Sequence, residues 1–226
     1  MIKNGGTRLM EKLGLTVDEV LTTTRAVRKR LDFKREVPFK LLRECLELAV
    51  QSPTGSVGQF WEFIFVDDSK KKHALGELYR KGWPLYVEKP NSIYNLHKDD
   101  DDMKTVAKKA GDSAEFLARN MGKAPWLMIP LIRGRSEDVP KANLAGYFGS
   151  VLPAVWSFML AARDRKLGTC WTTIHLMYEK EAADILGIPF EQFTQVAMVP
   201  IAYTKGSSFR AAPRKELDSF IHVNSW

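Results

Sequence analysis

An uncharged stretch over residues 142–162 constrains the fold more than any other feature of this 226-residue chain. At 21 residues it is long enough to cross a bilayer as a helix. Its aromatic residues are scattered through it, however, and small or polar residues interrupt it: Asn143, Gly146, Gly149, Ser150, Pro153 and Ser157. We therefore expect a helix buried on nearly every side, in a core or a subunit interface, and no membrane span. One copy of the chain is not expected to cover this helix alone.

Length and composition indicate one globular domain. The chain can bury a substantial core, and its 45% hydrophobic and 27% charged residues exclude collagen-like, low-complexity and wholly disordered classes. No linker rich in Gly, Ser or Pro divides the sequence. We expect a flexible arm over residues 1–15 and a single domain over residues 16–226. Two cysteines cannot form a disulfide scaffold, which favours the reducing cytoplasm.

The formal net charge of +7 favours an anionic ligand such as a phosphate. The basic residues are spread along the chain instead of forming one arm, so no nucleic-acid partner is expected. The four histidines lie far apart without the spacing of metal ligands, so no metal site is expected either.

Hydrophobic periodicity and turn residues predict helices and strands in an irregular order. Helical patterns cover residues 16–25, 38–51, 69–81, 103–121, 142–162 and 178–186. Strand patterns cover residues 61–66, 125–132, 169–174 and 195–204. We expect a long loop over residues 82–98, an end to the uncharged helix at Gly168, and an irregular tail from residue 206. The absence of a regular βαβ alternation predicts an α+β fold.

Three segments contain the candidate functional residues. Residues 22–30 place four cations within six residues, beside hydroxyl groups that could help to bind a phosphate. Residues 52–61 join a helix to a strand, and Gly55 and Gly58 there allow close approach to a flat ligand. Residues 167–173 offer backbone amides to a ligand ring. Each segment also has a purely structural interpretation: a solvated charge run, a turn and a core strand.

Together the segments resemble the nitroreductase superfamily of flavin enzymes over residues 22–226. The shared features are an arginine-rich start, a P-S/T-G-S/G-N-x-Q-x-W junction, an L-G-T-x-W segment and an aromatic C-terminal tail. The T-T-R-A-V-R-K-R-L-D opening and the tail from Phe209 to Arg214 are most similar to the actinobacterial nitroreductase-like branch. The resemblance implies a central mixed, mainly antiparallel sheet surrounded by helices. It also implies an intertwined homodimer with one FMN per subunit at the interface.

The resemblance also assigns cofactor contacts. Arg25 matches the family position for the phosphate, and Arg28 matches the position for the N1/C2-carbonyl edge of the flavin, where a fixed cation stabilises the reduced ring. The junction that meets the ring from the partner subunit corresponds to Pro53, Thr54, Gly55, Ser56, Val57 and Gln59. The segment whose backbone faces flavin N5 corresponds to Trp171, Thr172 and Thr173, with Cys170 beside it. The C-terminal phosphate region contains Arg210 and Arg214.

Two of the cofactor-contacting positions depart from the family pattern. Ala26 stands where many members carry Ser, which removes one hydroxyl contact to the cofactor. Val57 stands where the junction usually carries Asn. Because a lost hydrogen bond costs about 0.5–1.5 kcal/mol, FMN is still expected to bind.

These features predict an FMN-dependent oxidoreductase that takes a hydride from NADPH or NADH through flavin N5. A small-molecule acceptor, such as a nitroaromatic or a quinone, is then reduced in ping-pong order. No side-chain acid or base is required. Two alternatives are a specialised flavin enzyme of the same fold, either a reductive dehalogenase or an oxygen-dependent flavin-modifying enzyme, and a cofactor-free basic binding protein.

Overall fold

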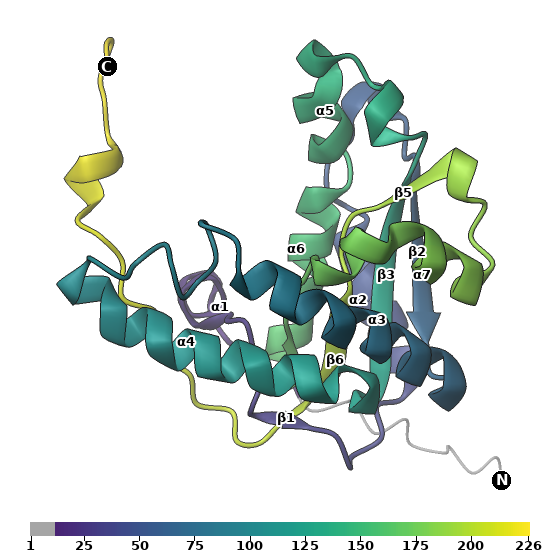
Figure 1. Ribbon diagram of the computed structural model, residues 1–226, viewed down its shortest axis with the longest axis horizontal. Helices are drawn as coiled ribbons and strands as arrows, with labels where there is room; N and C mark the ends of the chain where they lie inside the picture. Colours follow the sequence, from purple (N-terminus) through teal and green to yellow (C-terminus); the bar gives the residue numbers. More distant parts are fainter. Residues whose placement is uncertain (1–11) are drawn as a thin grey trace, which may run out of the picture.

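A six-stranded sheet separates two helical layers in the computed structural model, which describes residues 12–226 (Figure 1). The strand order is β1-β6-β3-β2, with β4 paired to β6 and β5 paired to β3. Every pairing between these strands is antiparallel, and an isolated bridge between Ala26 and Thr169 adds a parallel contact. The strands are β1 Leu31–Asp32, β2 Trp61–Val66, β3 Trp126–Arg133, β4 Leu167–Thr169, β5 Phe193–Gln195 and β6 Val199–Thr204. The α+β class predicted from the sequence is confirmed.

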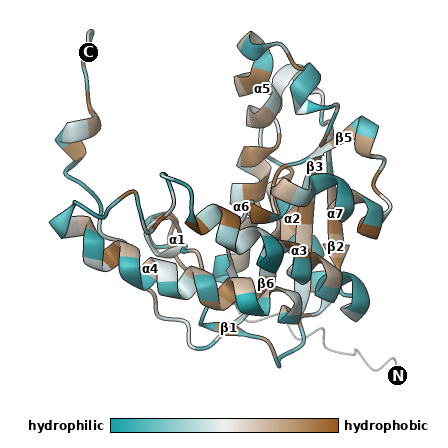
Figure 2. Cartoon of the chain, viewed as in Figure 1, coloured by the Kyte–Doolittle hydropathy of each residue, from teal (hydrophilic) through white to brown (hydrophobic). Residues whose placement is uncertain are grey.

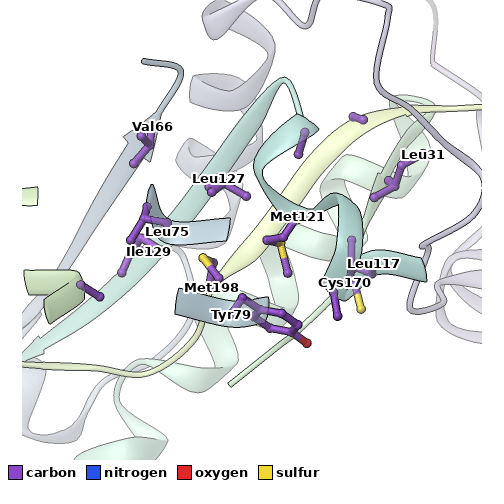
Figure 3. Close-up of a cluster of buried hydrophobic side chains, with 14 of the residues drawn as sticks. Leu31, Val66, Leu75, Tyr79, Leu117, Met121, Leu127, Ile129, Cys170 and Met198 are labelled. Carbon is purple, nitrogen blue, oxygen red and sulfur yellow. The ribbon is translucent and has the colours of Figure 1, made fainter. Parts of the chain in front are cut away.

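Two hydrophobic cores lie on the two faces of the sheet. Helices α2 (Phe39–Ala49) and α6 (Leu152–Asp164) cover one face, and α3 (Ser69–Val87), α4 (Asp101–Asn120) and α7 (Glu179–Leu186) cover the other. Because side chains alternate along a strand, Met128 of β3 enters the first core, under α2 and α6. Leu127 and Ile129 enter the second core, under α3, α4 and α7. Figure 3 shows Leu127 and Ile129 with Leu75 of α3 in this second core.

Three helix termini predicted from the sequence are confirmed, two at the start of a helix and one at its end. Helix α1 (Val17–Thr23) begins at a capping box in which Thr16 and Glu19 bond each other's backbone. Pro38 is the N-cap of α2, and Gly187 ends α7 with a left-handed φ of 72°. Residues 1–11 of the expected N-terminal arm lie outside the described residues, whereas Leu13 donates a backbone hydrogen bond of 2.7 Å to the Asp164 carbonyl.

The uncharged stretch is not one continuous helix. It forms the short turn Lys141–Asn143, helix α5 (Leu144–Gly149) and then α6, whose first turn contains Pro153. Helix α6 buries one face, including Val155 and Phe158, whereas α5 buries no residue, so one copy of the chain does not cover this stretch, as the sequence predicts. Among the described residues, Lys141–Asp164 is the stretch apolar enough to cross a membrane by length and composition, but α6 packs on α2 as a core helix does.

Two expectations are wrong because tertiary packing overrides local signals. The loop expected from residue 82 begins after Val87, since α3 continues through Pro84. Gly82 brings α3 against the turn Ile174–Tyr178, where an added Cβ would lie 2.7 Å from Ile174 Cγ2. This contact holds the last turns of α3 in place in spite of the proline.

The segment after α6 also differs from the sequence prediction. The helix ends at Asp164, Lys166 adopts a left-handed φ of 61°, and Gly168 lies inside β4 instead of ending the helix. A Cβ at Gly168 would lie 2.8 Å from Thr204 Cγ2, so the glycine serves close strand packing. Of the strand expected over residues 169–174, only Thr169 lies in β4, and Thr172 adds an isolated bridge to Met198.

Candidate functional site

Residues 25–30 and 208–210, from distant parts of the chain, contribute to one cationic cleft of about 500 Å³. It lies between the segment after α1, helix α4 and the start of the C-terminal tail, which are neighbours in Figure 1. Its lining is Arg25, Ala26, Val27, Arg28, Lys29, Arg30, Ser113, Ser208, Phe209 and Arg210. The structure therefore brings the first predicted segment together with Arg210, although Arg25 and Arg210 are 185 residues apart in the sequence.

The backbone anchors this cationic segment to the sheet. Val27 is 6% exposed and donates a 2.8 Å hydrogen bond to the Thr169 carbonyl of β4. Leu31 is fully buried, and β1 pairs with β6 directly after the segment. Because the apolar residues Val27 and Leu31 occupy the core, the charged residues between them are left to line the cleft.

Two arginines of the segment bind the tail. Arg25 Nη1 donates to the Arg210 carbonyl at 2.7 Å. Arg30 donates from Nε to the Lys205 carbonyl at 3.0 Å and from Nη1 to the Ser208 carbonyl at 2.7 Å. The tail carbonyls thus engage part of the donor capacity of both side chains, and Arg30 is directed more to the tail than to the open cleft.

Arg28 lies at the inner side of the segment, near two buried groups. Burial raises the pKa of the Tyr79 hydroxyl and of the Cys170 thiol, and the charge of Arg28 offsets part of each shift. Figure 3 shows both side chains among the apolar residues of the core. A guanidinium here places positive charge where the cleft meets the sheet.

The third predicted segment lies behind the cleft and not on its lining. Cys170 has no exposed surface, so the structure gives no support for a cofactor contact at this residue. Thr172 is 8% exposed and its hydroxyl donates to the Met198 carbonyl, while Met198 N–H donates back to the Thr172 carbonyl at 2.8 Å. Trp171 is half-buried and Thr173 is exposed, which leaves these two as the accessible residues of the segment.

The glycine-containing junction lies far from the cleft within one protomer. Its turn Gly55–Val57 contacts α5, and Gly55 N–H donates to Ser150 Oγ, just before α6, at 3.0 Å. Arg163 in the last turn of α6, by contrast, contacts the cleft residue Phe209. The 13 residues of α6 span about 20 Å at the usual helical rise. The junction borders its own hollow of about 410 Å³, which includes Pro53, Thr54, Val57 and Gln59.

The junction holds a strained backbone that the sequence pattern did not reveal. Ser56, Val57 and Gln59 adopt left-handed φ values of 53°, 56° and 46°. This region is unfavourable for a β-branched residue such as Val57, whereas Asn tolerates it. Gly58 is instead right-handed and leaves room for the Phe60 ring, since its Cβ would lie 2.4 Å from that ring. Strain of about 1–3 kcal/mol per residue of this kind is typical of functional sites.

In the tail, one residue predicted to contact the cofactor lies outside the cleft, and one residue without a predicted contact lines it. Arg214 is exposed and its guanidinium donates to the adjacent Pro213 carbonyl, so it does not line the cleft in one protomer. Phe209 lines the cleft and packs on the core, although the sequence assigned it no cofactor contact and only placed it in the tail of the resemblance. The available signal was an aromatic residue inside an otherwise polar segment.

The buried His175 follows the segment behind the cleft, and its lowered pKa predicts that the stability of the protein depends on pH. His175 has no exposed surface, and burial lowers its pKa to about 3, with Gln195 opposing part of the shift. Between pH 6.5 and pH 3, His175 therefore binds a proton in the unfolded chain but not in the folded chain. We expect the free energy of unfolding to fall as pH falls below about 6.5, by up to about 1.4 kcal/mol per pH unit from this residue.

Urea unfolding at pH 4.5, 6.5 and 8 checks this slope. The variant His175→Gln is expected to have a shallower pH dependence below pH 6.5, whatever its stability at pH 8. His73→Gln, at an exposed histidine, serves as the matched control and should keep the native slope. An unchanged slope in His175→Gln would show that other groups cause the acid sensitivity.

Fold and cleft together define an α+β protein in which the two ends of the chain form a cationic site. The model of the Nitroreductase family matches residues 21–203, and the chain belongs to this family. No curated protein sequence matches the chain.

Solved structures share the fold at low sequence identity. The FMN- and NADPH-dependent nitroreductase NfnB from Sphigopyxis sp. strain HMH is 19% identical, with a TM-score of 0.67 over 94% of this chain and 100% of that chain. Iodotyrosine deiodinase bound to FMN and 3-iodo-L-tyrosine is 19% identical, with a TM-score of 0.66 over 93% and 100%. A BluB-like flavoprotein from Clostridium difficile 630 is 16% identical, with a TM-score of 0.65 over 93% and 99%.

Proposed function

We propose that this protein is an FMN-dependent oxidoreductase that uses NADPH or NADH to reduce a small-molecule acceptor, such as a nitroaromatic or a quinone. The observation that carries the proposal is the cationic cleft formed by Arg25, Arg28 and Arg210 in a chain of the nitroreductase family. Its positive lining suits the phosphate of FMN, since charge-assisted hydrogen bonds from guanidinium groups bind phosphate strongly. The structural similarity to NfnB, an FMN- and NADPH-dependent nitroreductase, supports the same assignment.

In this proposal the three arginines have two separate roles. Arg25 and Arg210 bind the phosphate, and Arg28 lies at the N1/C2-carbonyl edge of the ring. When bound, FMN would accept a hydride at N5 from the nicotinamide and then transfer two electrons to the acceptor, in ping-pong order. The fixed charge of Arg28 stabilises negative charge at the ring edge without any proton transfer from a side chain.

We further propose that the working unit is a homodimer in which the junction of one subunit completes the cleft of the other. The separation of the two parts along α6 supports this proposal, because one protomer alone does not bring them together. The outer face of α5 and α6 supports it, because its exposed residues carry no charge: Ala145, Gly146, Gly149, Pro153 and Trp156. Hydrophobic colour extends along α5 and the neighbouring part of α6 in Figure 2. An exposed charge-free face of this extent is typical of a subunit interface.

The tail provides a second apolar surface for a partner copy. Leu217, Phe220, Val223 and Trp226 are 64–101% exposed, and Figure 1 shows this segment extending away from the body of the chain. An isolated chain gains nothing from exposing four such side chains, whereas a partner subunit could bury them. The exposed tail therefore supports the dimer independently of α5 and α6.

An absorbance spectrum of the purified protein tests the proposed function directly. We expect a yellow protein with the two visible bands of oxidised flavin, which bleaches when NADPH or NADH is added without oxygen. Admitting a nitroaromatic or a quinone should restore the colour. A colourless protein that takes up no added FMN would contradict the proposal.

A second candidate function keeps the fold and the flavin but changes the acceptor. The structural likeness to an iodotyrosine deiodinase and to a BluB-like flavoprotein favours it, as does the apolar Val57 at the junction. Turnover of iodotyrosine without oxygen, or oxygen-dependent loss of the flavin itself, would identify such an enzyme. Rapid reduction of nitroaromatics or quinones with the flavin intact would favour the first candidate.

A further inference from the structure

Phe209 differs in its surroundings from its neighbours at the start of the tail. It is half-buried, whereas Lys205, Gly206, Ser207, Ser208, Arg210 and Ala211 are all exposed. Its ring packs on the core cluster that contains Val27 and Leu31. The aromatic ring thus anchors the start of the exposed tail to the body of the protein.

Two guanidinium groups contact the Phe209 ring. The Cζ atom of Arg30 lies 3.9 Å from the ring centre, and that of Arg163 lies 4.9 Å from it. Both distances fall within the range of a cation–π contact. We call Phe209, Arg30 and Arg163 the tail clamp.

Arg163 depends on this ring more than an exposed arginine would. It is 5% exposed, and burial lowers the pKa of its guanidinium, with the charge of Arg30 adding to the effect. Its Nε donates to Thr23 Oγ1 at 3.2 Å. A buried cation needs compensating partners. The Asp164 carboxylate opposes part of the shift in the pKa of Arg163, and the electron-rich face of Phe209 lies close to both guanidinium groups.

Arg30 couples the clamp to the tail backbone. Besides contacting the ring, it binds the carbonyls of Lys205 and Ser208, and Lys205 N–H donates back to the Arg30 carbonyl at 2.8 Å. The residue after Phe209, Arg210, then receives the hydrogen bond from Arg25. The clamp therefore fixes the tail directly beside the two arginines to which the phosphate is assigned.

We propose that Phe209 is a positioning residue: through cation–π contacts with Arg30 and Arg163 it holds the tail against residues 25–30 and so forms one wall of the anion-binding cleft. Its effect on the ligand acts through Arg25 and Arg210 and not through contact with the phosphate. The functional half of this inference rests on the proposed FMN site. The structural half, the holding of the tail, does not.

The test compares substitutions that separate the aromatic face from simple apolar bulk. Phe209→Ala removes both, Phe209→Leu keeps an apolar side chain, and Phe209→Tyr keeps the ring. Phe190→Ala is the matched control, because the Phe190 ring has Arg135 Cζ at 3.9 Å from its centre but lies outside the cleft.

The first measurement is limited trypsin cleavage of the full chain without FMN, which targets Arg210, Arg214 and Lys215. We expect faster cleavage in Phe209→Ala and Phe209→Leu, and native rates in Phe209→Tyr and Phe190→Ala. The second measurement is FMN binding by quenching of flavin fluorescence. We expect affinity to fall by about tenfold in the Ala and Leu variants, because neither side chain offers the two guanidinium groups an aromatic face.

The outcomes separate the clamp from the proposed function. A native protein that binds no FMN contradicts the function, while the cleavage rates still decide whether the ring holds the tail. Native cleavage rates in Phe209→Ala overturn the clamp. Faster cleavage with unchanged FMN affinity shows that the tail does not form the cleft wall. Equal cleavage rates in the Leu and Tyr variants show that the aromatic contact does not hold the tail.

Discussion

Replacing Arg25 and Arg28 together with alanine is expected to abolish FMN binding at micromolar flavin. Arg25 lies where the segment meets the tail, and Arg28 lies where the cleft meets the core. A hydrogen bond to a charged group contributes about 1.5–3 kcal/mol. Loss of both groups should therefore weaken binding by about 10²- to 10⁴-fold. Flavin fluorescence titration of the purified variant measures the change.

The control for this variant removes the same charge elsewhere. Arg80 and Arg119 are 61% and 71% exposed at the side chain, and each is paired with a glutamate on its own helix. Arg80→Ala combined with Arg119→Ala should leave FMN affinity unchanged, since neither residue lines the cleft. If the Arg25/Arg28 variant folds and binds FMN as tightly as the native protein, the cleft is not the phosphate site.

The variant Trp156→Glu is expected to separate the subunits and release the flavin in one step. Trp156 is 39% exposed on the charge-free face of α6, where the proposed interface lies. Burying a carboxylate there without a partner costs several kcal/mol, so the dimer dissociation constant should rise by at least about 100-fold. Sedimentation equilibrium combined with flavin absorbance follows both quantities in the same sample.

A carboxylate on another surface controls for the added charge. Gln192 is exposed near β5, so Gln192→Glu should keep both the dimer and the flavin. The far-UV circular dichroism of Trp156→Glu should match that of the native protein, because a side chain at the outer face of α6 is not part of the core. A folded, monomeric Trp156→Glu that retains FMN would contradict a site shared between subunits.

Regular elements with strong local signals could be predicted from the sequence. The strand β2 was predicted with its observed bounds, because an aromatic and β-branched run between turn residues has little alternative. Helices α1, α2 and α7 followed from their caps and apolar spacing. The predictions failed after Gly82 and at Gly168, where the contacts of these glycines with Ile174 and Thr204 outweigh the local preference of the sequence.

The candidate site was predictable in part. The arginine-rich segment and Arg210 meet at the cleft, as a shared phosphate site requires. Arg30 and Cys170 show the limit of the sequence, since charge and position in a motif do not reveal that one binds tail carbonyls and the other lies in the core. Phe209 was missed because its importance comes from Arg163, a residue distant in the sequence.

The sequence by itself determined the family, the α+β class and the chemistry available, because residue type, caps and periodicity are local properties. Only the tertiary structure decided that Arg25 and Arg30 both line the cleft and bind tail carbonyls, and that the junction lies at the opposite end of α6 from Arg163. The physical reason is that burial and long-range contacts depend on how the elements pack. The same amino acid can therefore be a ligand, a clamp or a core residue according to its neighbours.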